Sequence, residues 1–407
     1  MADLRGWLES NEFVIGAYTA ALWRRVALDG VQDHTTLEMI KGAVDFHVHL
    51  SRAGTLRREY MPNGTDISAI AGWTLPQKQI ATANIHTGLA FTEEHLCGRI
   101  RPVIEAKIFS GDRECWAIAD TVPQVGLKDF GVLRQLKEEY AGRIDIKVGA
   151  YAQAGFKDPH DDPKRLNVIL DALKAGAEFL VGLPERDDEL GRVGFEGHVT
   201  TLLELGEEHH VPVQVHVDQM NSKVESGAFR MIRALQSLNP AKRRFFVESV
   251  EPRLWAVHVI SPSRYDPSRF NELLDLLLRY NIGVVVCPSA AISMRQLRSE
   301  EGPVFNSIAR VIEMLARGVH VRLGTDNVND MFIPSGTGNI IVEASQHLTN
   351  VLREYTLHII AKLVLGMKLD GADRALLHQS LMLTAEACKD HRGLLERIDS
   401  VRVPYDF

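Results

Sequence analysis

Four histidines and one aspartate stand out as residues whose types and spacing could do chemistry. His47 and His49 lie two residues apart in the apolar segment AVDFHVHL. Side chains alternate along an extended strand, so both imidazoles would point to the same side. His216, His258 and Asp326 lie near the ends of the similar segments VPVQVHVD, LWAVHVI and VHVRLGTD. Imidazole plus carboxylate is a donor set that suits zinc or ferrous iron, so the pattern predicts a divalent metal site.

Short apolar segments alternate along the chain with longer segments of helical period. DFGVLRQLKEEYAG, PKRLNVILDALKAGA, GHVTTLLELGEEHH and RFNELLDLLLRYN all show the i, i+3, i+4 apolar spacing of amphipathic helices. Strands that alternate with helices favour a parallel sheet, and the count of eight favours a closed (β/α)8 TIM-like barrel. The strands are expected at 43–50, 102–109, 144–153, 178–184, 211–218, 254–260, 282–289 and 319–326.

This architecture explains why distant residues could form one site. In a (β/α)8 barrel the C-terminal ends of all strands meet at one mouth, where active sites are built. The histidines and the aspartate fall at the ends of the first, fifth, sixth and eighth expected strands. The chain has 16 histidines, and a single one on an apolar strand is more often structural than a ligand. The prediction therefore depends on the combination.

Composition excludes several classes of function. The net charge is −7, and no run of like charges suggests nucleic acid or an anionic membrane as a partner. The four cysteines form no CxxC pair, which is typical of reduced thiols in the cytoplasm. No signal peptide is evident, and no apolar run is long enough to span a membrane. We expect a cytoplasmic protein that acts on a small molecule, binds neither nucleic acid nor membrane, and forms a homo-oligomer.

The order of the motifs resembles the amidohydrolase superfamily, metal-dependent hydrolases built on a (β/α)8 barrel, over residues 43–345. Within it the chain is similar to the cytosine deaminase branch, which includes the N-isopropylammelide amidohydrolases. Three segments carry this likeness: YAQAGF (151–156), HVDQ (216–219) and GTDNVNDMFIPSGTGN (324–339). The last, with its Pro-x-Gly-x-Gly loop after the aspartate, is the most specific.

The resemblance implies a role for each of the five residues. His47, His49, His216 and Asp326 would hold one divalent ion, Zn²⁺ first, with Fe²⁺ or Mn²⁺ as alternatives. His258 would lie near the metal-activated water as a base or electrostatic stabiliser, and Asp326 would also receive the proton of that water. Such an ion lowers the pKa of water from about 15.7 toward roughly 7. The fourth expected strand has no lysine that could bridge a second ion.

Several polar and aromatic residues near the strand ends are candidates for substrate binding. The resemblance implies this role for Gln153, whose amide can donate and accept hydrogen bonds to a heterocycle. Asn327 could do likewise, although a turn or helix-cap role is an equal alternative. Ser289 is expected at the barrel mouth. Trp73 could stack on a planar substrate, with packing against a helix as the alternative.

Gln219 departs from the branch. Its deaminases carry a glutamate at this position, which is thought to move a proton to the substrate ring, and an amide cannot titrate near neutral pH. One interpretation is that Gln219 hydrogen-bonds substrate or backbone while the chemistry runs through the metal site. The other is that Asp218, or Glu105 on the expected second strand, supplies the acid. We favour the first.

The terminal segments depart from the branch as well, because the small β-sandwich common there has no counterpart in the sequence. We expect a helical segment at 1–42, the barrel at 43–345 and a helical segment at 346–407, with the terminal helices covering the barrel bottom or mediating subunit contact. The predicted function is hydrolysis of a C–N bond in a small cyclic amide, amide or N-substituted heterocycle. The alternatives are a deaminase of an amino-heterocycle and a barrel that retains metal and binds a ligand without turnover.

Overall fold

The structure is a computed structural model that describes residues 42–61, 65, 70, 73–157, 162–293, 308–348 and 357–389. Nearly all of the expected N-terminal helical segment and the last eighteen positions, 390–407, lie outside the described residues. The predicted boundaries at 42 and 345 therefore stay predictions.

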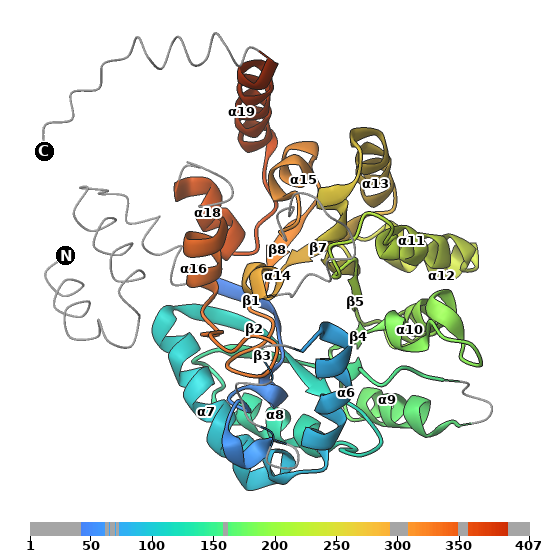
Figure 1. Ribbon diagram of the computed structural model, residues 1–407, viewed down its shortest axis with the longest axis vertical. Coiled ribbons are helices and arrows are strands. Elements are labelled where there is room, and N and C mark those ends of the chain that lie inside the picture. Colours follow the sequence, from blue (N-terminus) through green and yellow to red (C-terminus); the bar gives the residue numbers. More distant parts are fainter. Residues whose placement is uncertain are drawn as a thin grey trace, which may run out of the picture.

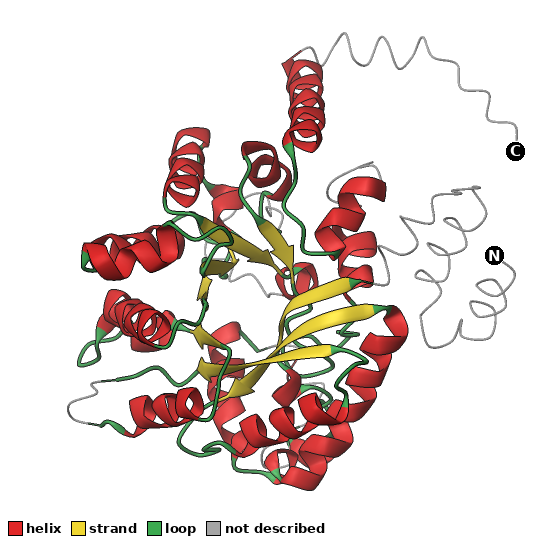
Figure 2. Cartoon of the chain, turned by 180° about the vertical axis from the view of Figure 1, so that it is seen from behind, coloured by secondary structure: helices red, strands yellow, loops and turns green. Residues whose placement is uncertain are grey.

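Eight parallel strands form one sheet in the order of the sequence. The sheet closes where Val48 pairs with Asp326 in an isolated parallel bridge. In both overall views the strands lie at the centre and the helices outside them (Figures 1 and 2), so the predicted (β/α)8 barrel is confirmed. The strands are β1 (Ala43–Val48), β2 (Asp112–Asp120), β3 (Asp145–Ala152), β4 (Phe179–Gly182), β5 (Val213–Val217), β6 (Leu254–His258), β7 (Ile282–Val286) and β8 (Val321–Leu323).

Helices follow each strand and pack their apolar faces on the sheet. The α-helices are α6 (Leu75–His86), α7 (Glu93–Ser110), α8 (Lys128–Glu139), α9 (Lys164–Lys174), α10 (Gly194–Glu208), α11 (Gly227–Ser237), α12 (Pro240–Val247), α13 (Pro267–Arg279), α14 (Pro288–Ser293), α15 (Val311–Arg317), α16 (Ile340–Val342), α18 (Leu357–Val364) and α19 (Gly371–Lys389). Shorter 3₁₀ turns are η1 (Leu50–Arg52), η2 (Arg58–Tyr60), η4 (Leu89–Phe91), η5 (Pro184–Asp187) and η6 (Ser261–Arg264), and η7 (Glu343–Leu348) is a π-helix. None of the described helices is long and apolar enough to cross a membrane.

The prediction of a second strand at 102–109 is wrong. That segment forms the second half of α7, which ends at Gly111 in a left-handed conformation with φ of 93°. The apolar residues Leu96, Ile100 and Ile104 recur every fourth position and are all fully buried, which is a helical period. The second strand of the structure, β2, begins with three charged residues, DRE. The apolar part that follows them is too short to predict a strand from the sequence.

Large aromatic side chains fill the barrel interior, and two glycines make room for them. Phe46 packs against Trp255 with ring centroids 4.6 Å apart. A Cβ atom at Gly283 would lie 2.3 Å from the Trp255 ring, and one at Gly149 would lie 2.4 Å from the Phe179 ring. Because such distances are far below van der Waals contact, glycine is required at both positions.

A buried ionic network ties the first strand to the segment that follows the last. Lys107 of α7 donates to Asp45 of β1 at 2.5 Å and to the Gly338 carbonyl at 2.6 Å, and it lies 3.3 Å from Asp112. The Asp45 carboxylate also accepts bonds from the backbone N–H and hydroxyl of Thr325. Thr325 precedes Asp326, so this network positions the aspartate of the predicted metal site.

Candidate active site

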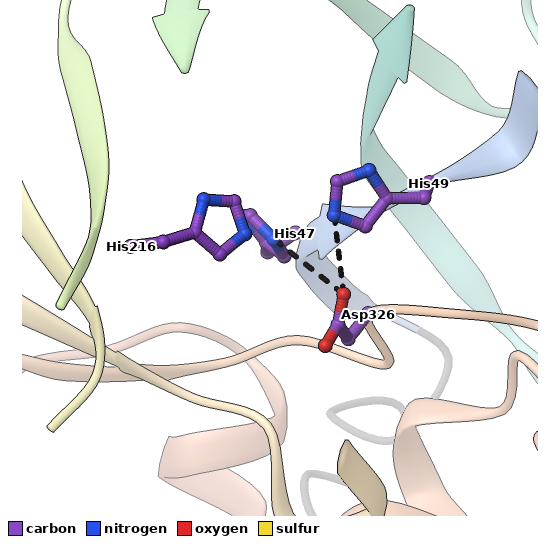
Figure 3. A group of neighbouring side chains, drawn as sticks. All are labelled: His47, His49, His216 and Asp326. Atoms are coloured by element: carbon purple, nitrogen blue, oxygen red, sulfur yellow. Dashed lines mark ion pairs between the residues drawn. The ribbon is translucent and has the colours of Figure 1, made fainter. Parts of the chain in front are cut away.

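The structure brings together the four predicted metal ligands at the mouth of the barrel (Figure 3). His47 lies in β1, His49 follows that strand, His216 lies in β5 and Asp326 follows β8. One ligand atom from each lies within 4.8 Å of all the others, and all four residues are buried. His49 Nε2 lies 3.2 Å from Oδ1 of Asp326, and His47 Nε2 lies 3.8 Å from the same oxygen.

Two of the imidazoles are held in a form that leaves Nε2 free. The Nδ1 atom of His47 lies 2.6 Å from Oε1 of Gln214, whose Nε2 donates to the Phe46 carbonyl at 2.9 Å. The amide oxygen of Gln214 therefore faces His47, so His47 carries its proton on Nδ1. His216 is held likewise, with Nδ1 2.9 Å from the carbonyl of Gly182. Partners of this kind orient metal-binding histidines.

Gln214 was missed by the sequence analysis. It lies two residues before His216 in VPVQVHVD, and the alternation of a strand puts both side chains on one face. A polar amide on the same face as a ligand histidine is the signal that could have identified it.

The charges of the cluster fit a divalent cation. Burial lowers the pKa of His216 and of His47, and it lowers that of His49 to about 3, with Arg52 adding to the effect. Burial alone would raise the pKa of Asp326, but the hydrogen bond to His49 and the neighbouring histidines hold it well below its usual range. Three neutral imidazoles and one carboxylate thus converge, and the buried Nε2 of His47 has no hydrogen-bond partner among the described residues. A metal ion would satisfy that atom.

His258 lies beside this cluster. It ends β6, its ring centroid is 5.2 Å from that of His216, and its Nε2 is 4.0 Å from Oδ2 of Asp326. Burial lowers its pKa to about 4, against the effect of Asp326. His258 is therefore neutral and can accept a proton or donate a hydrogen bond close to the ligands.

The backbone is strained where these strands end. Four of the nine described non-glycine residues with positive φ lie just after or at the ends of β5, β6 and β8: Asp218 at 55°, His258 at 79°, Val259 at 51° and Asp326 at 57°. Such conformations cost roughly 1–3 kcal/mol each and gather at functional sites. They turn the chain at the mouth, where His258 and Asp326 line the pocket.

A pocket opens above the cluster. His49, His216, His258 and Asp326 contribute to its lining, as do the predicted substrate-binding residues. The latter are Trp73, Gln153, Gln219 and Asn327. Among these, Asn327 is held by a bond from its Nδ2 to Asp330 at 2.6 Å.

Two cationic side chains also line this pocket. Arg52 lies 3.3 Å from Asp120 and is therefore paired. Lys78 is 9% exposed, and no ion pair or hydrogen bond joins its ammonium group to any side chain in the described ranges. Because Arg52 is balanced by Asp120, Lys78 and Asp326 are the remaining charged groups among the described lining residues.

Ser289 differs from the other predicted substrate-binding residues, because it is not among the described residues that line the pocket. Its hydroxyl donates to Glu343 at 2.5 Å, and its backbone N–H donates to the same carboxylate at 2.8 Å. Ser289 therefore anchors η7 to the start of α14.

Neither acid considered as a substitute for residue 219 is placed to serve. Glu105 lies on α7, not on a strand, and forms an ion pair with Arg143 on the surface, 2.6 Å away. Asp218 accepts the backbone N–H groups of Gly227 and Ala228 at 2.6 and 2.9 Å, which caps α11. The structure shows instead that Gln219 contacts an acid that the sequence analysis missed: its Nε2 donates to Glu185 at 2.9 Å.

Comparison with known proteins identifies a curated relative of this chain. The chain is 20% identical over 304 residues to N-isopropylammelide isopropyl amidohydrolase of Pseudomonas sp. (strain ADP), a match that covers 74% of this chain and 66% of that protein. The expected resemblance is confirmed. The chain thus spans slightly less than two thirds of the length of this curated relative. A comparison with family models finds no match.

Solved structures share the fold. 5-Methylcytosine deaminase from Klebsiella pneumoniae, bound to phosphonocytosine, has a TM-score of 0.67 at 20% identity, and the match covers 82% of this chain and 75% of that one. N-isopropylammelide isopropylaminohydrolase from Burkholderia multivorans ATCC 17616 has a TM-score of 0.59 at 18% identity, covering 79% and 72%. At these identities the likeness shows the barrel fold alone.

Proposed function

We propose that this protein is a metal-dependent hydrolase that cleaves a C–N bond of a small cyclic amide, amide or N-substituted heterocycle. The observation that carries the proposal is the convergence of three neutral histidines and Asp326 at the floor of a pocket, with His258 beside them. The curated relative is named for hydrolysis of N-isopropylammelide, which supports a nitrogen heterocycle as the substrate class.

In this proposal His47, His49, His216 and Asp326 hold one divalent ion, with Zn²⁺ expected first. When bound, the ion supplies Lewis acidity, which makes hydroxide available from water near neutral pH. Asp326 is ionised, so it is placed to accept the proton of the attacking water. Neutral His258, 4.0 Å from Asp326, donates a hydrogen bond to the oxygen that becomes negative during attack, or first accepts the proton held by Asp326 and then passes it to the leaving nitrogen.

The walls of the pocket orient the substrate. Gln153, Gln219 and Asn327 present amide groups that can pair with the edge of a heterocycle. Trp73 is half-buried at the rim and offers a flat apolar surface on which a planar ring can stack. The positive charge of Lys78 favours a substrate with anionic or strongly electronegative oxygens.

A second candidate function, a deaminase that releases ammonia from an amino-heterocycle, is favoured by one contact. That reaction requires an acid near the ring nitrogen, and Glu185 lies within hydrogen-bonding distance of Gln219. The two functions differ in the leaving group, an alkylamine or ring amide nitrogen in the first and ammonia in the second.

The proposal is tested with purified protein loaded with zinc, iron or manganese in parallel. A panel of cyclic amides, N-alkylamino-triazines and amino-pyrimidines is assayed for amine, ammonia and ring-opened products, together with metal content. Turnover that is lost on chelation and restored by one metal supports hydrolysis, and ammonia as the main product selects the deaminase. Stoichiometric metal without turnover of any compound would favour the ligand-binding barrel.

A further inference from the structure

The side-chain amide of Gln219 donates a hydrogen bond to a buried carboxyl group. Its Nε2 donates to Oε2 of Glu185 at 2.9 Å. Glu185 lies in η5, the turn that follows β4. The contact therefore joins the segments that follow two adjacent strands, β4 and β5. The backbone of the next residue is anchored as well, because the N–H of Met220 donates to Glu225 at 3.0 Å. Position 219 is thus fixed in both its side chain and its backbone.

The Glu185 carboxyl has little else to bond. Its Oε1 atom is buried and has no hydrogen-bond partner among the described residues. Burial, with the nearby carboxyls of Glu225, Asp218 and Asp188, raises the pKa of Glu185 to about 8, although the bond from Gln219 lowers it. Among the described residues, Gln219 is therefore the one polar side chain that stabilises the ionised form of Glu185.

The other end of the amide faces the pocket. Gln219 is among the residues that line it, and within the described ranges no hydrogen bond engages Oε1 of Gln219. The nitrogen and oxygen of an amide point in different directions, so Nε2 can donate to Glu185 while the carbonyl oxygen remains available as an acceptor. The pocket therefore meets an acceptor at residue 219.

We propose that Glu185 is a positioning residue that fixes the amide of Gln219, so that the carbonyl oxygen of Gln219 accepts a hydrogen bond from an N–H group of the substrate. This assignment rests on the proposed function and narrows its substrate class to compounds with an N–H next to the attacked carbon. A glutamate at position 219 could accept or deliver a proton there, whereas an oriented amide only accepts a hydrogen bond.

The proton on Glu185 makes this orientation sensitive to pH. The ionised carboxylate accepts hydrogen bonds only, so it holds the N–H₂ of Gln219 toward itself. The protonated carboxyl can also donate to the carbonyl oxygen of Gln219, which allows the amide to turn over. The preference for N–H substrates should therefore strengthen as the pH rises through about 8.

The anchoring is tested first without substrate, in the full-length metal-loaded protein. Selective nitrogen-15 labelling of glutamine side chains gives amide resonances, and those of Gln219 are assigned by their loss in Gln219→Glu. In the wild type they should shift with pH around a midpoint near 8. Glu185→Gln, which keeps the shape of the side chain, should abolish the shift. The control Asp188→Asn removes a neighbouring surface carboxylate that pairs with Arg230. It should keep the shift with a lower midpoint, because Asp188 contributes to the raised pKa of Glu185. Resonances that do not titrate in the wild type, or that titrate equally in Glu185→Gln, overturn the proposal.

The consequence for recognition is measured with the compound that the panel identifies and its N-methylated analogue. One hydrogen bond corresponds to about tenfold discrimination in favour of the N–H compound. In Glu185→Gln this ratio should fall below about threefold, through KM more than through kcat, while Asp188→Asn leaves it unchanged. An unchanged ratio in Glu185→Gln contradicts the assignment. If no compound is turned over, the proposed function fails, and the resonances of Gln219 still decide the role of Glu185.

Discussion

At the scale of single residues, the site depends on groups that are not themselves predicted metal ligands. Gln214 holds Nδ1 of His47, and the Gly182 carbonyl holds Nδ1 of His216. A buried imidazole could otherwise turn or carry its proton on either nitrogen. Fixing the proton on Nδ1 directs the lone pair of Nε2 to the centre of the cluster, which prepares the ligands before an ion arrives.

Removal of a ligand should abolish the metal site. In His216→Ala we expect loss of both bound metal and turnover, because the remaining ligands leave an open coordination position in a buried pocket. Metal content per protein is measured by elemental analysis after dialysis. The control His210→Ala changes an exposed histidine and should retain both. Stoichiometric metal in His216→Ala, or in a variant without His47 and His49, would refute the assigned ligands.

Gln214 offers a more selective change. Gln214→Met keeps the size of the side chain but leaves Nδ1–H of His47 without its acceptor, so metal affinity should fall by about 10–100-fold. The affinity is measured by competition with a chelator of known affinity. Gln236→Met alters an exposed glutamine that bonds Tyr280 and should bind metal as the wild type does. Equal affinities would show that His47 needs no such partner.

At the scale of elements, the barrel interior sets the shape of its strands. Trp255 and Phe179 occupy space that a side chain on the neighbouring strand would need, and Gly283 and Gly149 provide it. Above this aromatic layer the strands end in positive φ values at Asp218, His258 and Asp326. The packed layer supports these strained turns, because rigid strands beneath them leave the chain few other paths.

Gly283→Ala should therefore destabilise the fold. The new Cβ would meet the Trp255 ring at 2.3 Å, and overpacking of this kind costs about 1–3 kcal/mol or more. The free energy of unfolding is obtained from urea denaturation of metal-loaded protein. Gly98→Ala is the matched control, since it lies on the exposed face of α7 with nothing within 4 Å and should gain about 0.5–1 kcal/mol. Equal effects of the two substitutions would contradict this account of the interior.

At the scale of the whole molecule, the same backbone hydrogen bonds close the barrel and bring the predicted ligands together. The backbone N–H of Asp326 donates to the carbonyl of His47 at 2.8 Å, and that of His49 donates to the carbonyl of Asp326 at 2.7 Å. Three predicted ligands thus make the hydrogen bonds that join the first strand to the last. A metal ion on their side chains would reinforce the same seam.

Metal removal should accordingly lower stability. A ligand that binds only the folded state, at a concentration one hundred times its Kd, stabilises it by about 2.7 kcal/mol. The melting temperature of the metal-loaded protein should fall on addition of a chelator, as followed by circular dichroism. His216→Ala should melt at one temperature with and without chelator. An equal melting temperature of the wild type with and without chelator would show that the ion does not stabilise the closed barrel.

The buried Lys107 network crosses the same seam. Lys107→Met removes the cation between Asp45 and Asp112, and breaking a buried ion pair in this way costs about 3–5 kcal/mol because a charge is left uncompensated. Urea denaturation measures the loss. Lys242→Met removes a surface cation that pairs with Glu204 and should change stability by less than about 1 kcal/mol. Similar losses in both variants would mean that burial of Lys107 adds nothing.

Much of the fold could be predicted because the periods of strands and helices are local. Seven of the eight expected strands overlap those of the structure; the exception, 102–109, contains enough apolar residues for either element. Its helical period continues from Leu96. Only the packing of α7 on the barrel, which buries this apolar face, shows that the segment is a helix. The ligands could be proposed because parallel strands bring their C-terminal ends together in any such barrel.

The sequence by itself determined the alternation of elements, the strand-end positions of the histidines and Asp326, and the absence of a titrating acid at residue 219. Only the tertiary structure decided which groups hold them: Gln214 for His47, Glu185 for Gln219 and Asp45 for the segment before Asp326. The same periodicity predicts Ser289 at the barrel mouth, and the structure shows that its hydroxyl donates to Glu343. The physical reason is distance along the chain. Periodicity shows which side of a strand a residue faces, whereas a hydrogen bond between residues 34 or 280 positions apart depends on register and closure.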